Sequence, residues 1–215
     1  LIDDLRPSWL IFSDGFRVSR AVRWTKRAID LMLSFAMAVI TSPLMVLTAI
    51  AVRLESSGPV LYCQERVGEN GRNFTLCKFR SMRTDAEKGG TPIWAKDDDD
   101  RTMRVGRFIR KTRLDELPQL WNVIHGDMSF VGPRPERPFF VAELARDIPF
   151  YQQRHAVKPG LTGWAQVKYR YGSSREDAME KLRYDLYYIK HLSVFFDLTI
   201  VFDTVKVVLF RKGAA

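Results

Sequence analysis

The chain has 215 residues, a formal net charge of +9 and a pI near 9.7. This length allows one compact domain of about 150 residues beside a membrane segment, and therefore one active site by default. The charge indicates an anionic partner: nucleic acid, anionic lipid head groups or a phosphorylated substrate. Two cysteines, Cys63 and Cys77, are too few for a disulfide framework and lack the spacing of a zinc site. We therefore expect reduced, buried thiols.

The first 22 residues lack a sustained hydrophobic period. We interpret residues 1–22 as a linker or the tail of a missing upstream domain, and the first residue, a leucine rather than a methionine, fits that interpretation. We expect residues 23–54 to form a membrane helix. The remaining residues, 55–215, are then expected to form one cytosolic domain.

The membrane helix is predicted from an uncharged, mostly apolar run of 22 residues, Leu31 to Val52, which Ser42 and Pro43 interrupt. As a straight helix this run would be about 33 Å long, enough to cross a hydrocarbon core. A proline inside a helix removes one backbone donor, so we expect a bend here. The Ser42 hydroxyl is then available to bond the freed carbonyl group.

Basic residues flank this run on both sides. Because Lys and Arg near a membrane segment favour the cytoplasmic side, a simple span would leave one flank on the wrong side. A re-entrant segment that enters, breaks at Ser42-Pro43 and returns to the same face satisfies both flanks. An ordinary kinked span and a buried soluble helix are the alternatives. The flanking cations are Arg17, Arg20, Arg23, Lys26 and Arg27 before the run, and Arg53, Arg66, Arg72, Lys78, Arg80 and Arg83 after it.

The soluble part predicts a β-hairpin followed mainly by helices, with amphipathic ones at the surface. Two runs of strand composition, 60–64 and 74–79, are separated by a turn signal at 69–72. Apolar residues at helical spacing follow the hairpin. The predicted helical stretches are 105–124, which Gly126-Asp127 ends, 137–156, with a break near Pro149, and 177–210.

The segments between these helices carry other signals. Two prolines fix residues 131–135 in an extended conformation, and Pro159-Gly160 predicts a turn. Residues 88–100, which include four consecutive aspartates, predict a solvated loop, because they lack the spacing of a calcium loop. The aromatic residues of 177–210 fit either a helix lying on a bilayer or ordinary core packing.

A carboxylate pair, Asp115-Glu116, follows several cations within the stretch 107–120. Thr112 could cap a helix with Asp115 at its third position, or a helix could begin at Pro118. Either choice places both carboxylates near a helix N-terminus, where backbone amides also favour phosphate. A carboxylate so placed should keep a low pKa, as a nucleophile or magnesium ligand requires. A Thr-x-x-Asp capping box without catalytic function is the alternative.

Basic side chains elsewhere are candidates for phosphate contacts, although each could equally be a solvated surface cation. Lys78 and Arg80 are two residues apart, so on a strand they would share a face. Arg134 lies between two prolines, which would present its guanidinium from a stiff backbone and suit bidentate phosphate recognition. Lys158, beside Pro159-Gly160, is a third basic candidate.

Taken together, these motifs resemble the bacterial sugar transferase family, the monotopic phosphoglycosyl transferases. The Leu-Asp-Glu-Leu-Pro and Gly-Pro-Arg-Pro blocks are highly specific, and the similarity runs from about residue 23 to 210. The blocks that carry it are Lys26 to Asp30, Ser42-Pro43, Gln64 to Gly68, Lys78 to Met82, Arg107 to Asn122, Gly126 to Pro135, Lys158 to Gln166 and Asp185 to Tyr188.

The resemblance implies a mainly helical α+β fold with a re-entrant helix-break-helix hairpin in the cytoplasmic membrane of a bacterium. It implies transfer of a sugar 1-phosphate from a UDP-sugar to polyprenyl (undecaprenyl) phosphate, the first membrane step of exopolysaccharide or O-antigen assembly. The catalytic domain would face the cytoplasm, among inner-membrane lipids. The chain resembles the catalytic part of a long-form member. Long forms could form a homodimer through the missing upstream domain, and this fragment would then be monomeric. The identity of the sugar remains open.

The same resemblance implies roles for individual residues. Asp115 would be the nucleophile that forms a covalent phospho-sugar intermediate, with Glu116 as its partner. Magnesium, bound at these two carboxylates, would neutralise the diphosphate. Substrate-binding positions that match the family are Lys78, Arg80, Arg110, Arg134, Pro135, Lys158 and Asp185.

A non-enzymatic function is the competing hypothesis. The apolar segment would then anchor a basic module that docks on anionic lipid or a partner protein, and Asp115-Glu116 would only cap a helix. Nucleic-acid binding is not expected, because no recognised binding motif is present and the apolar segment would have no purpose.

Overall fold

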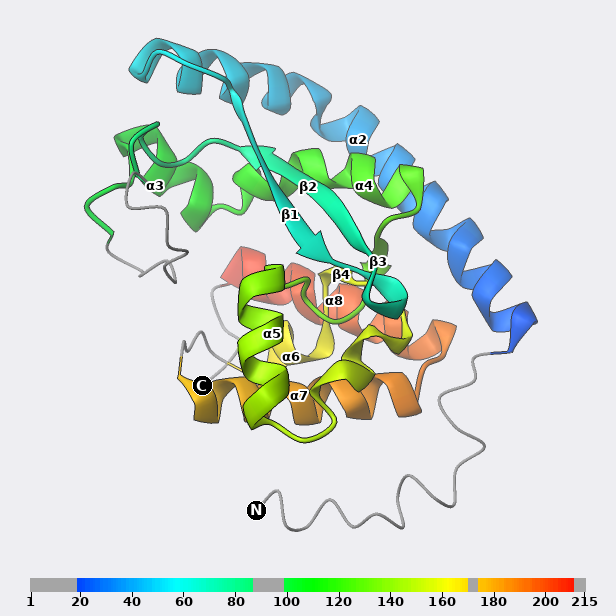
Figure 1. Ribbon diagram of the computed structural model, residues 1–215. Coiled ribbons are helices and arrows are strands. Elements are labelled where there is room, and N and C mark those ends of the chain that lie inside the picture. The colour runs from blue at the N-terminus through cyan, green and yellow to red at the C-terminus, as the bar shows by residue number, and fades with distance from the viewer. Residues whose placement is uncertain (1–18, 87–98, 170–173, 211–215) are drawn as a thin grey trace.

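The computed structural model describes residues 19–86, 99–169 and 174–210 (Figure 1). Helices dominate this part of the chain and two small two-stranded sheets accompany them, which confirms the predicted mainly helical class. Most of the predicted linker and of the aspartate-rich loop lies outside the described residues. The elements are α2 (Arg20–Glu55), β1 (Leu61–Val67), η1 (Glu69–Gly71), β2 (Asn73–Phe79), α3 (Arg104–Lys111), η2 (Leu114–Gln119), α4 (Leu120–His125), β3 (Ser129–Val131), α5 (Pro138–Asp147), η3 (Tyr151–Ala156), β4 (Gly160–Thr162), α6 (Trp164–Lys168), α7 (Arg175–Lys190) and α8 (Val194–Phe210).

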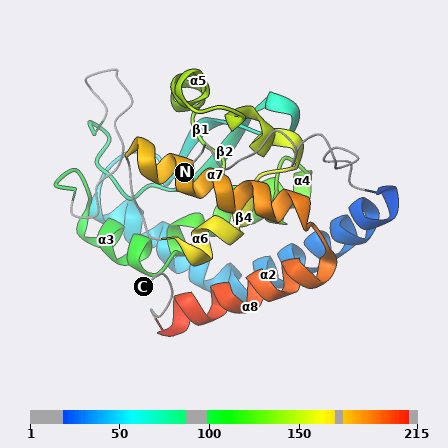
Figure 2. The same cartoon turned by 90° about the horizontal axis from the view of Figure 1, so that it is seen from below.

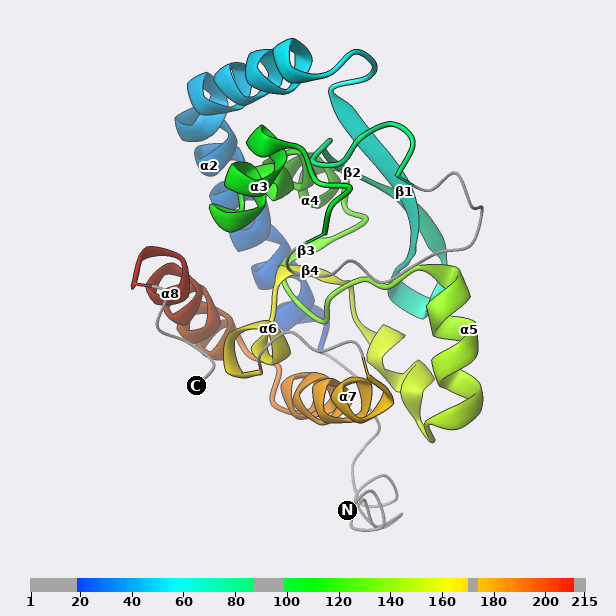
Figure 3. The same cartoon turned by 90° about the vertical axis from the view of Figure 1, so that its left-hand side faces the viewer.

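Helix α2 contains Pro43 and changes direction part-way along its length (Figure 3). Pro43 has no N–H for the carbonyl group of Val39, four residues earlier. The Ser42 hydroxyl donates to that carbonyl instead, at 2.8 Å. The predicted bend and the predicted role of Ser42 are confirmed. The helix nevertheless continues through Pro43, without the interruption expected of two separate helices.

One face of α2 packs on the rest of the protein and the other face is exposed. Among the described residues, α2 is the one helix long and apolar enough to cross a membrane, and only 11% of its most apolar window is buried. The alternative prediction for this segment, a buried soluble helix, is therefore wrong. The large exposed apolar side chains of α2 are Trp24, Leu31, Met32, Phe35, Val39, Ile40, Leu44, Val46, Leu47, Ile50 and Leu54.

Both ends of α2 are bonded to the same domain. Near its N-terminus, Lys26 donates to Asp197 of α8 at 2.6 Å and to the Val131 carbonyl at 3.0 Å. At its C-terminus, Glu55 accepts the first two backbone N–H groups of α3, at 2.7 and 2.8 Å. A carboxylate at this position satisfies N–H groups that a helix leaves unpaired. The domain therefore accompanies α2 along its whole length.

The Lys-Arg-x-x-Asp block at the start of α2 has a structural role. Buried Asp30 accepts hydrogen bonds from the Ser129 hydroxyl at 2.8 Å and the Phe130 N–H at 3.0 Å. Arg27 donates to the carbonyl groups of Val123 and Ile124 in the last turn of α4, at 2.6 and 2.8 Å. This part of the block fixes α2 to β3 and α4.

Strands β1 and β2 form the predicted antiparallel hairpin, with η1 as its turn. Their register places Cys63 directly opposite Cys77, and the two form a disulfide. The expectation of two reduced thiols is wrong. The separation of 14 residues between the two cysteines does not by itself predict a disulfide. The pairing depends on the strand register, which brings the two Cβ atoms together.

Strands β3 and β4 pair in parallel, so Gly160 begins a strand and the turn predicted at Pro159-Gly160 is wrong. Gly132 donates to the Thr162 carbonyl, and Gly160 donates to the Pro133 carbonyl, both at 2.9 Å. The backbones lie so close that a Cβ on Gly132 would approach the Lys158 carbonyl oxygen to 2.4 Å. Glycine is required here, and residues 133–137 after β3 are not helical.

The helices enclose a core beneath α2 and α8. Figures 2 and 3 show these two helices on one side of the protein and α5 on the opposite side. Leu117, Leu120 and Tyr188 belong to the buried core that the inner face of α2 covers. On α8, Phe195 and Phe202 are exposed. Helices α7 and α8 thus combine core packing with an exposed apolar face, so neither alternative alone describes them.

Candidate active site

A left-handed residue turns the chain between α3 and the carboxylate pair. Arg113 has φ 61° and ψ 14°, and η2 begins at the next residue. Both predicted helix starts are wrong: the Thr112 hydroxyl donates back to the Phe108 carbonyl at 2.8 Å, and Pro118 lies inside η2. The expectation that the carboxylate pair lies near a helix N-terminus is confirmed, because Asp115 occupies the first turn of a short helix.

Asp115 is a buried carboxylate, with 6% of its surface exposed. Its Oδ1 atom is buried and has no hydrogen-bond partner. Burial, and secondly the charge of Glu116, raise the pKa of Asp115 to about 6, although Lys78 and two arginines oppose that rise. The expectation of a low pKa is wrong for this residue, because the cost of removing it from water exceeds the stabilisation by its neighbours.

Glu116 has the opposite electrostatic environment. Its Oε1 atom accepts from Arg134 Nη2 at 2.7 Å and from Arg113 Nη1 at 3.4 Å. Burial alone would raise the pKa of Glu116, but these two guanidinium groups outweigh it and lower the pKa to about 2. The adjacent carboxylates therefore differ: one is held ionised by arginines, and the other carries an unpaired oxygen.

Lys78 supplies a cation from the neighbouring strand β2, which packs on η2. Burial lowers the pKa of Lys78, and the charge of Asp115 is the main effect that raises it. Its ammonium group also lies 5.9 Å from the centre of the Tyr62 ring. The structure thus brings Lys78, Arg134 and the carboxylate pair together, as predicted.

The extended segment after β3 presents Arg134 to this cluster. Arg154 Nη2 donates to the Arg134 carbonyl at 2.9 Å, and Arg66 Nη1 donates to the Pro135 carbonyl at 3.0 Å. Asp185 lies behind this segment, where it pairs with Arg154 at 2.8 Å and is only 2% exposed. Pro135 and Asp185 therefore support the site from behind.

Three further predicted substrate-binding residues contact other parts of the chain. Arg80 is buried and donates to the carbonyls of Ser56 and Ser57 after α2, at 2.8 Å each, so Lys78 and Arg80 contact different groups. Its position after the end of β2 explains the difference. Arg80 therefore joins the chain after α2 to the hairpin.

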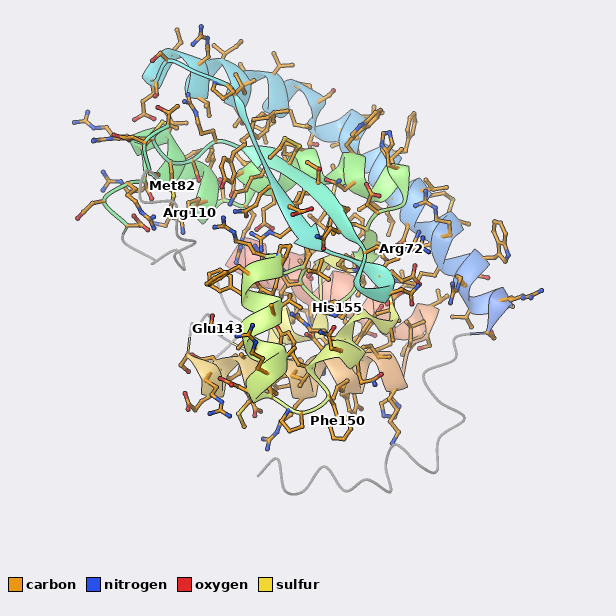
Figure 4. All side chains as sticks on the ribbon, viewed as in Figure 1. Arg72, Met82, Arg110, Glu143, Phe150 and His155 are labelled. Carbon is orange, nitrogen blue, oxygen red and sulfur yellow. A yellow bond between two sulfur atoms is a disulfide. The ribbon has the colours of Figure 1, made fainter. Side chains whose placement is uncertain are left out.

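Arg110 and Lys158 also have other neighbours. Arg110 donates to the Thr102 hydroxyl at 3.1 Å, and Thr102 bridges to Met82, which lies beside Arg110 in Figure 4. Burial, and secondly Arg27, lower the pKa of Lys158. The Lys158 ammonium lies close to Gly126, which ends α4 on the side away from η2 and the carboxylate pair.

The carboxylate pair fits a magnesium ion with few protein ligands. The unpaired, buried Oδ1 of Asp115 is suited to a cation, and Glu116 lies next to it. Among residues 19–86, 99–169 and 174–210, no group of three or more His, Cys, Asp or Glu side chains forms a metal site. Magnesium commonly takes one or two carboxylates and completes its octahedron with water and substrate phosphates. Such an ion would depend on a phosphorylated ligand.

Comparison with known proteins identifies the family of the chain. The family model described as bacterial sugar transferase matches residues 21–211, which include every residue of the cluster. The chain belongs to the bacterial sugar transferase family. The resemblance inferred from its motifs is confirmed.

Three curated relatives place the chain within this family. It is 47% identical over 189 residues to the UDP-N-acetylgalactosamine-undecaprenyl-phosphate N-acetylgalactosaminephosphotransferase of Aeromonas hydrophila, covering 88% of this chain and 44% of that protein. It is 43% identical to the UDP-glucose:undecaprenyl-phosphate glucose-1-phosphate transferase of Escherichia coli, covering 85% and 40%. A protein of the same name from Caulobacter vibrioides is 41% identical, covering 98% and 80%. The chain thus spans less than half the length of the first two relatives.

Two arginines of this bacterial sugar transferase site were not among the predicted site residues. Arg113 directly precedes Leu114-Asp115, so its sequence position already pointed to the site. Arg154 lies 39 positions beyond Asp115 in a segment predicted as an ordinary amphipathic helix. No local pattern distinguishes it, because two of its partners, Asp185 and Arg134, come from distant segments of the chain.

Proposed function

We propose that this chain transfers a sugar 1-phosphate from a UDP-sugar to polyprenyl phosphate at the cytoplasmic face of a bacterial membrane. The reaction would proceed through a covalent intermediate on Asp115 and begin the assembly of a surface polysaccharide. The relatives named above support the two substrate classes. Their names include both N-acetylgalactosamine and glucose donors, so the sugar is an outcome of the experiment below.

One observation carries the proposal: Asp115 is buried beside three cations and keeps an oxygen without a partner. A structural carboxylate with the same burial would normally have its hydrogen bonds satisfied. At pH 7 a group with a pKa of about 6 is mostly ionised, and its unpaired oxygen is then a nucleophile. This arrangement favours an enzyme over an anchor in which the pair merely caps a helix.

In the first step, a carboxylate oxygen of Asp115 attacks the phosphorus that carries the sugar. The bond from that phosphorus to the bridging oxygen breaks, and UMP leaves with the electron pair of that bond. Lys78 and Arg134, which lie beside Asp115, would stabilise the charge that develops on the phosphates. Glu116, paired with Arg134, holds that guanidinium in place.

In the second step, an oxygen of the polyprenyl phosphate attacks the phospho-sugar attached to Asp115. The acyl phosphate bond breaks, which releases a lipid-linked sugar diphosphate and restores the carboxylate. The two anionic substrates react in turn and need not occupy the site together. Magnesium bound to Asp115 and Glu116 would neutralise phosphate charge during the reaction.

The acceptor, polyprenyl phosphate, is anchored in the membrane by its lipid chain. The fold places the nucleophile close to an apolar surface. The residues that follow Asp115 on η2 and α4, Leu117 and Leu120, pack in the core that α2 covers. The outer face of α2 is exposed and apolar, as is part of α8. A phosphate at the membrane surface would therefore lie near Asp115 without leaving the head-group region.

The proposal includes a re-entrant position for α2. An ordinary span would separate Lys26 from Glu55 by the hydrocarbon core, whereas both residues contact the same polar domain. The bend at Pro43 supports the same topology. After replacement of the native cysteines, cysteines introduced at Arg20 and Ser56 should both react with an impermeant maleimide from the cytoplasmic side. Labelling from opposite sides would contradict it.

The function is tested with detergent-solubilised protein, magnesium, undecaprenyl phosphate and a panel of UDP-sugars. We expect UMP release and a lipid-linked sugar diphosphate with at least one donor. The Asp115→Asn variant should produce neither, because an amide cannot accept the phosphoryl group. Equal turnover by Asp115→Asn and wild type would overturn the assignment of the nucleophile. Binding to anionic lipid with no turnover of any donor would favour the anchor module.

A further inference from the structure

Asp185 is placed to bind another side chain rather than a substrate. It lies on α7, is 2% exposed, and its Oδ2 atom accepts two hydrogen bonds from Arg154, from Nε at 3.1 Å and Nη2 at 2.8 Å. A carboxylate buried with such a partner does not meet the donor or the acceptor directly. Its contribution to the reaction must pass through Arg154.

Arg154 joins three separate segments of the chain. Besides its bonds to Asp185, its Nη2 donates to the Arg134 carbonyl at 2.9 Å and its Nη1 donates to the Tyr151 hydroxyl at 2.8 Å. Only 6% of Arg154 is exposed. A planar guanidinium can hold partners in several directions at once, which the single ammonium group of lysine cannot do with the same geometry.

The bond from Arg154 restrains the residue whose side chain faces the nucleophile. Arg134 lies between two prolines, which limit its backbone, and the hydrogen bond to its carbonyl fixes the remaining peptide orientation. From that backbone its guanidinium donates to Glu116 at 2.7 Å. The line of contacts runs from Asp185 through Arg154 and Arg134 to the residue next to Asp115.

We propose that Arg154 and Asp185 are positioning residues that set the location of the Arg134 guanidinium beside the carboxylate pair. This inference rests on the proposed function, because it concerns the rate at which Asp115 is loaded. It assigns Asp185 a role other than the substrate binding implied by the family resemblance. It also assigns Arg154 a part in the reaction without contact with either substrate.

The inference is tested by single-turnover release of UMP, with magnesium and a donor that the wild type uses, and without lipid acceptor. We expect Arg154→Lys and Asp185→Asn to release UMP about 100-fold more slowly, as a misplaced catalytic group can cost. Tyr151→Phe is the matched control. It removes one bond of Arg154 but leaves the contacts with Asp185 and Arg134, so its rate should stay at the wild-type value.

A double-mutant cycle separates positioning from a general loss of structure. If Arg154 acts through Arg134, the double variant Arg154→Lys with Arg134→Ala should be no slower than Arg134→Ala alone. Multiplied losses would overturn the inference, as would a wild-type rate for Arg154→Lys. If Asp185→Asn does not fold, Arg154→Lys, which keeps the buried charge, carries the test alone. No UMP from the wild type would instead contradict the proposed function.

Discussion

Replacing Asp115 by Asn should stabilise the folded protein while removing its activity. A pKa raised from 3.8 to about 6 means that ionised Asp115 costs the folded state about 3 kcal/mol relative to the unfolded chain at pH 7. Asparagine removes this charge and keeps the shape. The buried amide still lacks a partner, which costs about 1–2 kcal/mol. The expected net gain is about 1–2 kcal/mol.

The measurement is thermal unfolding in detergent, with EDTA present so that no magnesium binds to the carboxylates. For a protein of this size the expected gain corresponds to a rise in Tm of about 2–8 °C at pH 7. The gap should close as the pH falls. Above pH 6 the wild type bears the full cost of the charge; below that pH folded Asp115 binds a proton, and below pH 3.8 both states are protonated and the cost is gone.

Two results would refute this reasoning. One is an Asn variant that is less stable than the wild type at pH 7, which would mean that the charge of Asp115 is compensated in the fold. The other is a stability gap that does not change with pH. The electrostatic cost of the carboxylate would then not be the source of the difference.

The remaining predictions concern the neighbours of the site and the hairpin. Lys78→Met should raise the pKa of the nucleophile and move the acid limb of the pH–rate profile to higher pH, whereas an unshifted limb would argue against their interaction. In urea titrations, Gly132→Ala should lower the unfolding free energy by about 3 kcal/mol, because the added Cβ would meet the backbone at 2.4 Å. Gly71→Ala is the comparison: it lies in open space at φ 74° and should lower the unfolding free energy by about 1 kcal/mol. Denatured, unreduced protein should show no free thiol, and reduction of Cys63–Cys77 should cost up to about 3 kcal/mol; two titratable thiols before reduction would contradict the disulfide.

Features with local causes could be predicted from the sequence. The bend in α2 follows from Pro43, and the partner of the freed carbonyl is the adjacent Ser42, so the whole arrangement lies within one helical turn. The hairpin follows from two strand-like runs around a turn signal. The carboxylate pair and Arg134 were found for the same reason, since each lies in a short, distinctive block.

Features that depend on contacts between distant segments could not be predicted. The pKa of Asp115 depends on burial beneath other elements, and a helix-capping argument alone gave the wrong direction. Lys78 and Arg80 are two positions apart, but the strand ends between them and their side chains have different partners. Asp185 pairs with Arg154, and no sequence pattern connects these two residues.

The central claim is that Asp115 carries the sugar phosphate during the reaction. Intact-protein mass spectrometry tests it most directly, after the solubilised protein has been mixed with magnesium and a panel of UDP-sugars without lipid acceptor. We predict a mass increase of one sugar phosphate, together with UMP release, and neither in Asp115→Asn. Addition of undecaprenyl phosphate should then restore the original mass. Formation of the lipid-linked product by a wild-type protein that never acquires the added mass, even in rapid-quench samples, would contradict the covalent mechanism.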